Sequence, residues 1–172
     1  TRTRAAFEAG AELLGGHAAF IDVSTTRITA GEAIKDVAKM YEKYGHGIGL
    51  RILDNAIDYR YGLGNGLVKE YARYSEVPVI NMACCTYHPT QGLADLMTVR
   101  EKLGKIRGKK SVIMWGYSKQ FRGRCSIQEE ALVMTRFGMD VVLAHPPGFD
   151  VDPKILEDAK RNANESGGSF EV

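Results

Sequence analysis

Two threonines alternate with two arginines at the start of the chain, in Thr1-Arg2-Thr3-Arg4, directly before an amphipathic helical pattern. The first turn of a helix leaves backbone N–H groups unpaired and carries partial positive charge. Hydroxyl and guanidinium groups added there make an anion site, and phosphate is the anion that fits best. The alternative is that the threonines cap the helix and the arginines are solvated.

A histidine and a glutamine lie one helical turn apart in His88-Pro89-Thr90-Gln91, after a strand-like segment and at a helix start. Ligands of parallel α/β folds bind at the carboxyl ends of strands. His88 can donate to a carbonyl oxygen, and Gln91 offers a donor and an acceptor to an amide-like group. Alternatively, His88 caps the helix and Gln91 faces solvent. Arg51, which closes an apolar strand-like run, is a third candidate at this edge.

The segments that must position these residues alternate between helical and extended patterns. The pattern predicts strands over residues 17–22, 47–52, 77–81, 111–115 and 139–145. It predicts helices over residues 7–14, 34–41, 67–75, 125–137 and 153–165, and one from Pro89 with Leu93, Leu96 and Met97 facing inward. Glycines predict a loop over residues 59–66.

Strands that alternate with helices predict βαβ units, twice over. We therefore expect an α/β fold with a parallel sheet flanked by helices, followed by part of a second Rossmann-like α/β domain. Residues 103–110 are short, charged and contain glycine, so we expect a hinge there, with domains at residues 1–106 and 107–172. The second unit stops after two or three strands, so we expect the chain to be part of a longer protein.

The composition is that of an ordinary soluble protein. Among 172 residues, 44% are apolar and 26% charged, and the net charge of +2 gives no reason to expect nucleic acid or membrane as a partner. No apolar run approaches the roughly 18–20 residues that span a bilayer. Because Thr1 is not a natural start, the sequence does not exclude an upstream targeting segment.

The cysteines and histidines give no sign of a disulfide framework or a metal site. Cys84, Cys85 and Cys125 are odd in number, with an adjacent pair, and have no metal-ligand spacing. We expect free buried thiols in a reducing cytoplasm. Neither a metal nor a cofactor is expected.

Two motifs in order make the sequence similar to one known family. Thr1-Arg2-Thr3-Arg4 with Phe7-Glu8 resembles the carbamoyltransferase signature S-T-R-T-R-x-x-F-E without its leading serine. His88-Pro89-Thr90-Gln91 with Asp95-Leu96 resembles the family pattern H-P-[TC]-Q-x-x-x-D-L. The segments GEAIKD, GIGLR and VPVIN follow the family order between them. The resemblance to the aspartate/ornithine carbamoyltransferases spans essentially the whole chain and is strongest over residues 1–103.

The resemblance implies a site for carbamoyl phosphate. It implies phosphate contacts from Thr1, Arg2, Thr3 and Arg51. It places the carbamoyl oxygen near Thr3, Arg51 and His88 and the carbamoyl nitrogen near Gln91, so that Arg51, His88 and Gln91 become the candidate catalytic residues.

Two arginines near these motifs have other expected roles. Arg60 is the alternative to Arg51 as the family's strand-end arginine, because additional residues follow Arg51. Arg4 is expected to be structural and to pair with acidic groups near the site.

The sequence departs from the family in two loops. The family's mobile loop, often supplied by a neighbouring subunit, usually brings a lysine or glutamine to the phosphate, whereas Ala30 and Gly31 stand here. Arg27 is a candidate replacement, and a solvated loop arginine is the alternative. In the turn over residues 116–124, Arg124 and Lys119 are candidate contacts for the acceptor, with ordinary surface residues as the alternative.

The resemblance implies transfer of a carbamoyl group from carbamoyl phosphate to an amino group of a small amino acid (ornithine- or aspartate-like), or the reverse phosphorolysis of a ureido compound. It also implies homotrimers, or multiples of trimers, with shared sites. A non-catalytic carbamoyl-phosphate-binding paralogue is the alternative. Gly62-x-Gly64-x-Gly66 is weak support for a nucleotide-binding oxidoreductase, because these glycines do not directly follow a strand.

Overall fold

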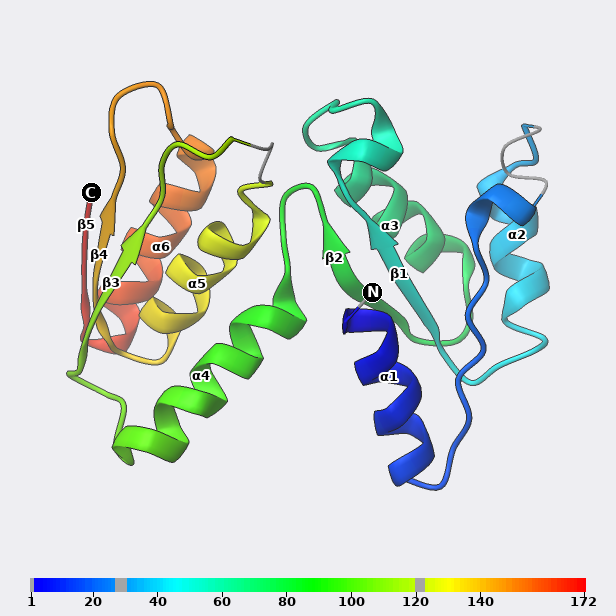
Figure 1. Cartoon of the computed structure of the whole chain (residues 1–172), viewed down its shortest axis with the longest axis horizontal. Coiled ribbons are helices and arrows are strands. Elements are labelled where there is room, and N and C mark those ends of the chain that lie inside the picture. The colour runs from blue at the N-terminus through cyan, green and yellow to red at the C-terminus, as the bar shows by residue number, and fades with distance from the viewer. Residues whose placement is uncertain (1, 27–30, 120–122) are drawn as a thin grey trace.

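The computed structural model describes residues 2–26, 31–119 and 123–172, and these fold around two separate parallel sheets (Figure 1). The first sheet and its helices consist of α1 (Arg2–Leu13), η1 (Val23–Thr25), α2 (Ile34–Tyr41), β1 (Ile48–Ile52), η3 (Asp54–Ile57), α3 (Leu63–Tyr74), β2 (Val79–Cys84) and α4 (Pro89–Leu103). The second consists of β3 (Lys110–Met114), α5 (Cys125–Arg136), β4 (Asp140–Ala144), α6 (Pro153–Ser166) and β5 (Ser169–Glu171). The predicted fold class, parallel sheets flanked by helices, is confirmed.

The first sheet is a parallel pair whose register shifts beside the candidate site. β1 runs parallel to β2, and the partners of Leu50 and Arg51 on β2 are Asn81 and Ala83, so Met82 is an additional residue on β2. An irregularity of this kind bends the pair locally and re-aims side chains. It falls directly before Arg51, at the carboxyl end of β1. The small core under this sheet is formed by α2 and α3.

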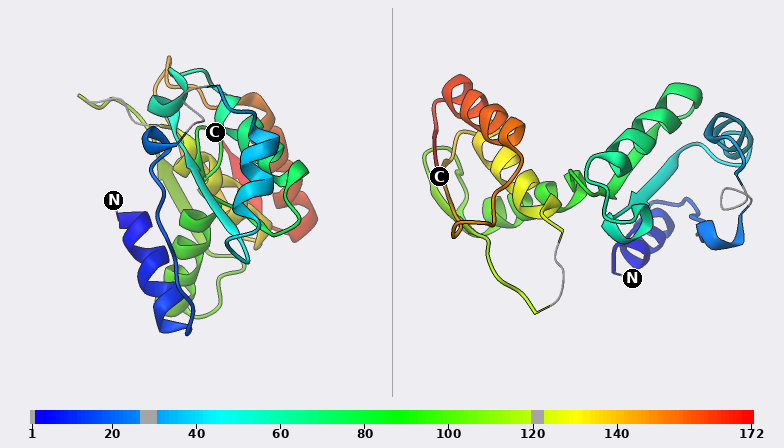
Figure 2. Two further views of the ribbon diagram at one scale, coloured as in Figure 1. Left: turned by 90° about the vertical axis from the view of Figure 1, so that its right-hand side faces the viewer. Right: turned by 90° about the horizontal axis from the view of Figure 1, so that it is seen from above.

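The second sheet has the order β3-β4-β5, all parallel, with α5 and α6 packed on it. Met139, Leu143 and Ile155 are among its fully buried side chains. The strand β5 was not among the strands that the sequence pattern predicted. Seen from above, the two sheets lie at opposite ends of the molecule with α4 between them (Figure 2). In the described part of the chain, no helix is long and apolar enough to cross a membrane.

Helix α4 joins the two halves through a narrow buried stripe. Gly92 and Leu96 are buried, whereas Leu93 and Met97 are 52% and 53% exposed, so the prediction that both face inward was wrong. A Cβ at Gly92 would lie 2.7 Å from Glu129 Cγ of α5. Two helices that cross this closely touch along one row of i, i+4 positions, which leaves neighbouring apolar side chains at the margin.

A second interface between the halves is polar. The amide of Gln128, which is fully buried on α5, donates to the carbonyl of Thr86 at 2.8 Å and accepts from the backbone N–H of Asp152 at 3.1 Å. The hydroxyl of Tyr61 lies 3.1 Å from Gln128 Nε2 and 2.9 Å from Asp152 Oδ2. Burial, chiefly, raises the pKa of Tyr61 to about 12, so its proton is available to Asp152 near neutral pH. Three segments are thereby held around one amide.

Two predictions about the first half were wrong. Residues 17–22 run without a strand partner among the described residues, and Phe20 and Ile21 are about half exposed, so this apolar run is not a strand. Residues 63–66 belong to α3 and not to a loop. The helix starts after Gly62, whose φ of 86° favours glycine, and Gly64 lets α3 approach β1, because a Cβ there would lie 2.5 Å from the carbonyl of Ile52.

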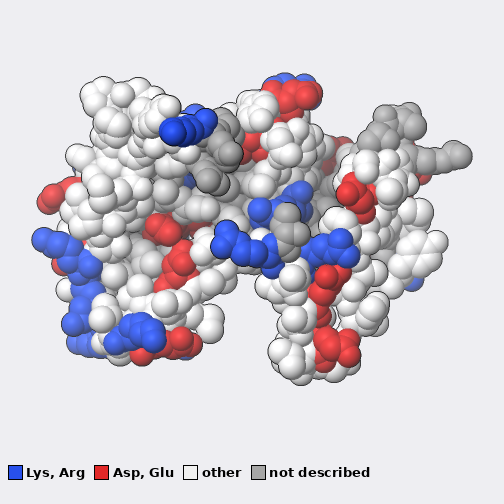
Figure 3. All heavy atoms as spheres, viewed as in Figure 1, with Lys and Arg blue, Asp and Glu red and all other residues white. Residues whose placement is uncertain are grey.

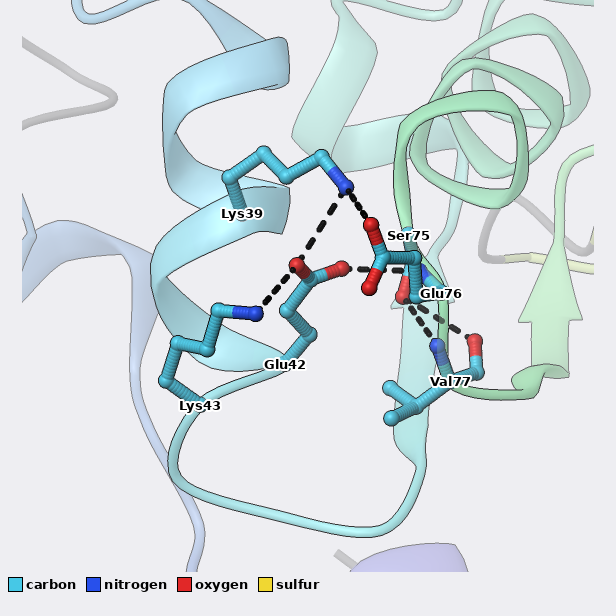
Figure 4. Close-up of polar contacts among 6 residues, drawn as sticks. All are labelled: Lys39, Glu42, Lys43, Ser75, Glu76 and Val77. Atoms are coloured by element: carbon cyan, nitrogen blue, oxygen red, sulfur yellow. Dashed lines mark hydrogen bonds and ion pairs between the residues drawn. The ribbon is translucent and has the colours of Figure 1, made fainter.

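A buried carboxylate ties α2 to the turn that precedes β2 (Figure 4). Glu42, whose side chain is 1% exposed, accepts from the backbone N–H of Glu76 at 2.7 Å and pairs with Lys39 and Lys43 at 3.3 and 3.2 Å. The N–H of Glu76 and then the two lysines hold the pKa of Glu42 below its usual value. This contact fixes where β2 begins relative to α2.

The three cysteines are free and buried, as expected.

Candidate functional site

Thr3 and Arg51, two residues of the predicted phosphate site that are far apart in the sequence, are in contact in the structure. Thr3 lies in the first turn of α1, and Arg51 Nη1 donates to Thr3 Oγ1 at 3.1 Å across 48 positions of sequence. Arg2 begins α1 and is exposed, and the first turn carries no acidic residue. Basic side chains gather at this end of α1 (Figure 3). An anion placed here would meet helix N–H groups, a hydroxyl and guanidinium groups together. Thr1 lies outside the described residues.

The two other arginines near these motifs, Arg4 and Arg60, make their contacts elsewhere. Arg4 pairs with Glu8 at 3.0 Å and stacks 4.0 Å above the ring of Phe20, which agrees with the structural role expected for it. Arg60, the alternative to Arg51, is exposed and donates to the carbonyl of Ile57 in its own turn. Of the two candidates, Arg51 is the one that contacts Thr3. Arg27 and the loop around it lie outside the described residues.

His88 is buried at the start of α4, and the positive charge of Arg51 acts on its imidazole. Burial, and then the charge of Arg51, lower the pKa of His88, so the imidazole is neutral near pH 7. His88 is the N-cap residue of α4, and its carbonyl accepts from the backbone N–H of Gln91 at 2.9 Å, as the alternative expected, but its side chain makes no capping bond to the helix. The backbone N–H of His88 instead donates to Glu129 Oε2 at 3.2 Å, from α5 of the second half.

The direction of the Thr90 hydroxyl is linked to the tautomer of His88. Thr90 Oγ1 lies 3.3 Å from His88 Nδ1 and 3.0 Å from the carbonyl of Met82. A hydroxyl has one proton, so while Thr90 donates to Met82 it can only accept from Nδ1–H, and Nε2 is then an acceptor. With the hydroxyl turned toward Nδ1, the compatible neutral tautomer carries its proton on Nε2, which is then a donor. His88 can therefore serve either a carbonyl oxygen or an N–H, according to the rotation of Thr90.

The side chain of Gln91 is exposed, but a hydrogen bond to Asp95 orients it. Its Nε2 donates to Asp95 Oδ1 at 2.9 Å, one turn further along α4. Because a carboxylate only accepts, this bond occupies Nε2 and leaves Oε1 as the atom that can accept from a ligand. An acceptor is what an NH2 group on a ligand requires.

The predicted acceptor contacts are less well placed. Arg124 Nη1 donates to the carbonyl of Asp150 at 2.9 Å, and its guanidinium lies 5.0 Å from the ring centre of Tyr61. Lys119 is exposed. Residues 120–122 of the same turn lie outside the described residues. A role for Arg124 and Lys119 in holding an acceptor stays a prediction.

Sequence reasoning missed the acidic residues that support this site. Glu129 binds the backbone of His88, and the carboxyl of Glu130 lies within hydrogen-bonding reach of Asp95. Adjacent glutamates in a helix are usually solvated, and the sequence pattern offered no reason to bury them. The available signal was Gly92, the small residue on α4 that allows α5 to approach.

Comparisons with known proteins agree with this geometry. Residues 1–101 match the carbamoyl-P binding domain of aspartate/ornithine carbamoyltransferase. The chain is 37% identical over 172 residues to an ornithine carbamoyltransferase of Thermococcus kodakarensis, covering 100% of the chain and 50% of that protein. It is 36% identical over 186 residues to an N-acetylornithine carbamoyltransferase of Xanthomonas campestris, covering 99% of the chain and 55% of that protein.

Solved structures give the same result. An ornithine carbamoyltransferase from Pyrococcus furiosus superimposes with a TM-score of 0.83 at 36% identity, over 99% of this chain and 49% of that one. A variant of N-acetyl-L-ornithine transcarbamylase complexed with carbamyl phosphate and N-succinyl-L-norvaline superimposes with a TM-score of 0.86 at 34% identity, over 100% and 56%. The chain thus spans about half the length of the relatives it matches. It belongs to the aspartate/ornithine carbamoyltransferase family.

Proposed function

We propose that the protein transfers the carbamoyl group of carbamoyl phosphate to an amino group of a small amino acid, or catalyses the reverse phosphorolysis of a ureido compound. The observation that carries this proposal is the 3.1 Å contact between Arg51 and Thr3, which joins the strand-end arginine to the helix tip. Names of the relatives support it, because they include ornithine and N-acetylornithine carbamoyltransferases.

The phosphate and carbamoyl ends of the substrate would be held by different elements. The N–H groups at the start of α1, with Arg2 and Thr3 and with Thr1 before them, would bind the phosphate oxygens. Arg51 donates to Thr3 at this helix tip and its charge acts on His88, which supports contacts of Arg51 with both the phosphate and the carbamoyl oxygen. Gln91 Oε1 would accept from the carbamoyl NH2.

The chemistry requires stabilisation of one developing charge. A neutral amine attacks the carbonyl carbon, and a tetrahedral oxyanion forms. Its collapse breaks the C–O bond to phosphate, and the amine's proton leaves with the phosphate. Thr3, Arg51 and His88 would face the oxyanion, and a preorganised donor is worth roughly 3–4 kcal/mol in comparable sites. His88 donates in this step only if Thr90 turns its proton toward Nδ1.

The cellular location, the oligomeric state and the acceptor contacts are proposed on the family resemblance alone. We infer a cytoplasmic protein that forms homotrimers or multiples of trimers with shared sites, in which Arg27 of the partner subunit could supply the cation, because Ala30 and Gly31 carry no charge. Arg124 and Lys119 are proposed as acceptor contacts. The family reaction needs no cofactor.

The test uses the intact protein with carbamoyl phosphate and a panel of small amino acids, with phosphate release and ureido product as readouts. The reverse direction uses ureido acids with phosphate. We expect Arg51→Ala to lower turnover about 100-fold or more, because it removes an oxyanion donor. Arg60→Ala, the matched arginine substitution in the turn after η3, should leave turnover unchanged. Binding of carbamoyl phosphate without turnover of any partner would instead identify a non-catalytic binding protein.

A further inference from the structure

Two carboxyl groups, those of Asp95 and Glu130, meet between α4 and α5, and no basic side chain of the described residues forms an ion pair with either of them. Asp95 uses Oδ1 to accept from Gln91, while its Oδ2 is buried and has no donor as long as both carboxyls are ionised. The carboxyl of Glu130 lies within hydrogen-bonding reach of Asp95. A protonated Glu130 carboxyl has an O–H group that can donate to Asp95 Oδ2. One proton shared by the pair would therefore give this buried oxygen a hydrogen-bond partner.

The surroundings of Glu130 favour keeping that proton. Burial, and then contact with the Asp95 carboxylate, raise the pKa of Glu130 to about 7. On the same helix, Glu129 is used by the backbone of His88, and on α6 the side chains of Asp158 and Arg161 bind each other at 2.6 Å. The strands under α5 present apolar side chains to it. Among the described residues, Asp95 is the charge that acts on Glu130.

We propose that Glu130 is a positioning residue for Gln91, which acts when its protonated carboxyl donates to Asp95 Oδ2. That bond holds Asp95, Asp95 Oδ1 holds Gln91 Nε2, and Gln91 Oε1 is thereby fixed toward the carbamoyl NH2. Loss of the proton places two negative charges side by side and removes the donor. The proposal rests on the proposed function, because Gln91 must contact the carbamoyl group for its orientation to matter.

The position also connects the two halves of the chain. Gln91 and Asp95 lie on α4, which contacts the first sheet, whereas Glu130 lies on α5, which covers the second. The phosphate contacts Arg2, Thr3 and Arg51 belong to the first half alone. Glu130 should therefore affect binding of the carbamoyl end and not binding of the phosphate end.

The test compares wild type with Glu130→Gln, whose amide N–H donates to Asp95 at every pH, and with Glu130→Met, which has no donor. Glu157→Gln, on the exposed side of α6, is the matched control. The measurements are the dissociation constants of carbamoyl phosphate and of inorganic phosphate between pH 6 and 8.5. Expressing each constant relative to Glu130→Gln removes the titration of the ligand itself.

Relative to Glu130→Gln, wild type should bind carbamoyl phosphate equally at pH 6 and about three- to tenfold more weakly at pH 8.5. Glu130→Met should be weakened by a similar factor at all pH values. Inorganic phosphate should show none of these differences. A wild-type profile parallel to that of Glu130→Gln, or carbamoyl-phosphate binding by Glu130→Met equal to that of wild type at pH 6, would overturn the proposal.

A second readout keeps the two proposals apart. If wild type binds no carbamoyl phosphate at any pH, the proposed function fails, and the positioning role fails with it. The shared proton is then still tested by thermal unfolding. Because the folded pKa of Glu130 is raised, its contribution is complete below the unfolded value near 4.5 and is lost as the pH rises through about 7. The melting temperature of Glu130→Gln relative to wild type should therefore rise as the pH increases from about 4.5 to about 7 and level off above that, and a difference that stays constant across this range would refute the shared proton.

Discussion

Replacing Gln128 by leucine should destabilise the protein by about 2 kcal/mol. The change leaves the Thr86 carbonyl and the Asp152 N–H without their partner, and an unpaired buried polar group costs roughly 1–3 kcal/mol. Burial of the apolar leucine side chain offsets about 2 kcal/mol of this loss of stability. The two unpaired groups together cost roughly 2–6 kcal/mol, so the net loss is about 0–4 kcal/mol. Water at the start of α6 can partly replace the bond of the Asp152 N–H, which places the expected loss near the middle of that range.

Urea unfolding of the purified protein, followed by circular dichroism, measures this difference. Tyr61→Phe is the matched control, because it removes the hydroxyl but leaves both backbone bonds of Gln128 in place. We expect it to cost less than about 1 kcal/mol. If Gln128→Leu is no more destabilising than Tyr61→Phe, the buried amide does not hold the two halves together as argued.

Two further substitutions test the packing that positions the site. Glu42→Gln should make the stability of the protein less dependent on pH below about 4.5. The pKa of Glu42 is lowered in the folded state, so its contribution to stability is present above about pH 4.5 and is lost as the pH falls through the folded-state pKa. Melting curves from pH 3 to 7 check this. Equal slopes for both proteins below pH 4.5 would contradict it. Gly92→Ala should destabilise by about 1–3 kcal/mol, because its Cβ would lie 2.7 Å from Glu129 Cγ. Urea unfolding measures this, with Ala94→Gly on the exposed side of α4 giving the helix-propensity difference between alanine and glycine. Stabilisation of the protein by Gly92→Ala to the extent of that difference would show that α5 shifts freely.

The parts of the site that sequence could predict depend on short-range rules. Pro89 suits the first turn of a helix, and a run of hydroxyls and arginines before an amphipathic pattern suits a helix tip, so both motifs were placed at helix starts. The carboxyl-end rule for parallel strands then predicted that Arg51 would lie at the same edge. The contact of Arg51 with Thr3 agrees with that prediction.

The errors concern contacts between elements. An apolar run such as residues 17–22 indicates a strand only if another strand is available to pair with it, which periodicity does not report. Gly62 and Gly64 read as a loop because glycine is a poor helix former, yet Gly64 is in a helix because the backbone of Ile52 lies against it. The burial of Glu130 depends on how closely α4 crosses α5, which no pattern within α5 contains.

The start of α4 is held from both sides, and this limits how the two halves can move relative to each other. Thr90 is bonded to Met82 of β2, while His88 is bonded through its backbone to Glu129 of α5. Because neighbouring residues are attached to different sheets, a rotation of one half against the other must break one of these bonds or carry His88 with it. The helix tip of α1 has no comparable bond to the second half among the contacts of the described residues. Movement between the halves would therefore change the geometry around the proposed carbamoyl contacts while the proposed phosphate contacts stay in place, which would separate carbamoyl positioning from phosphate affinity.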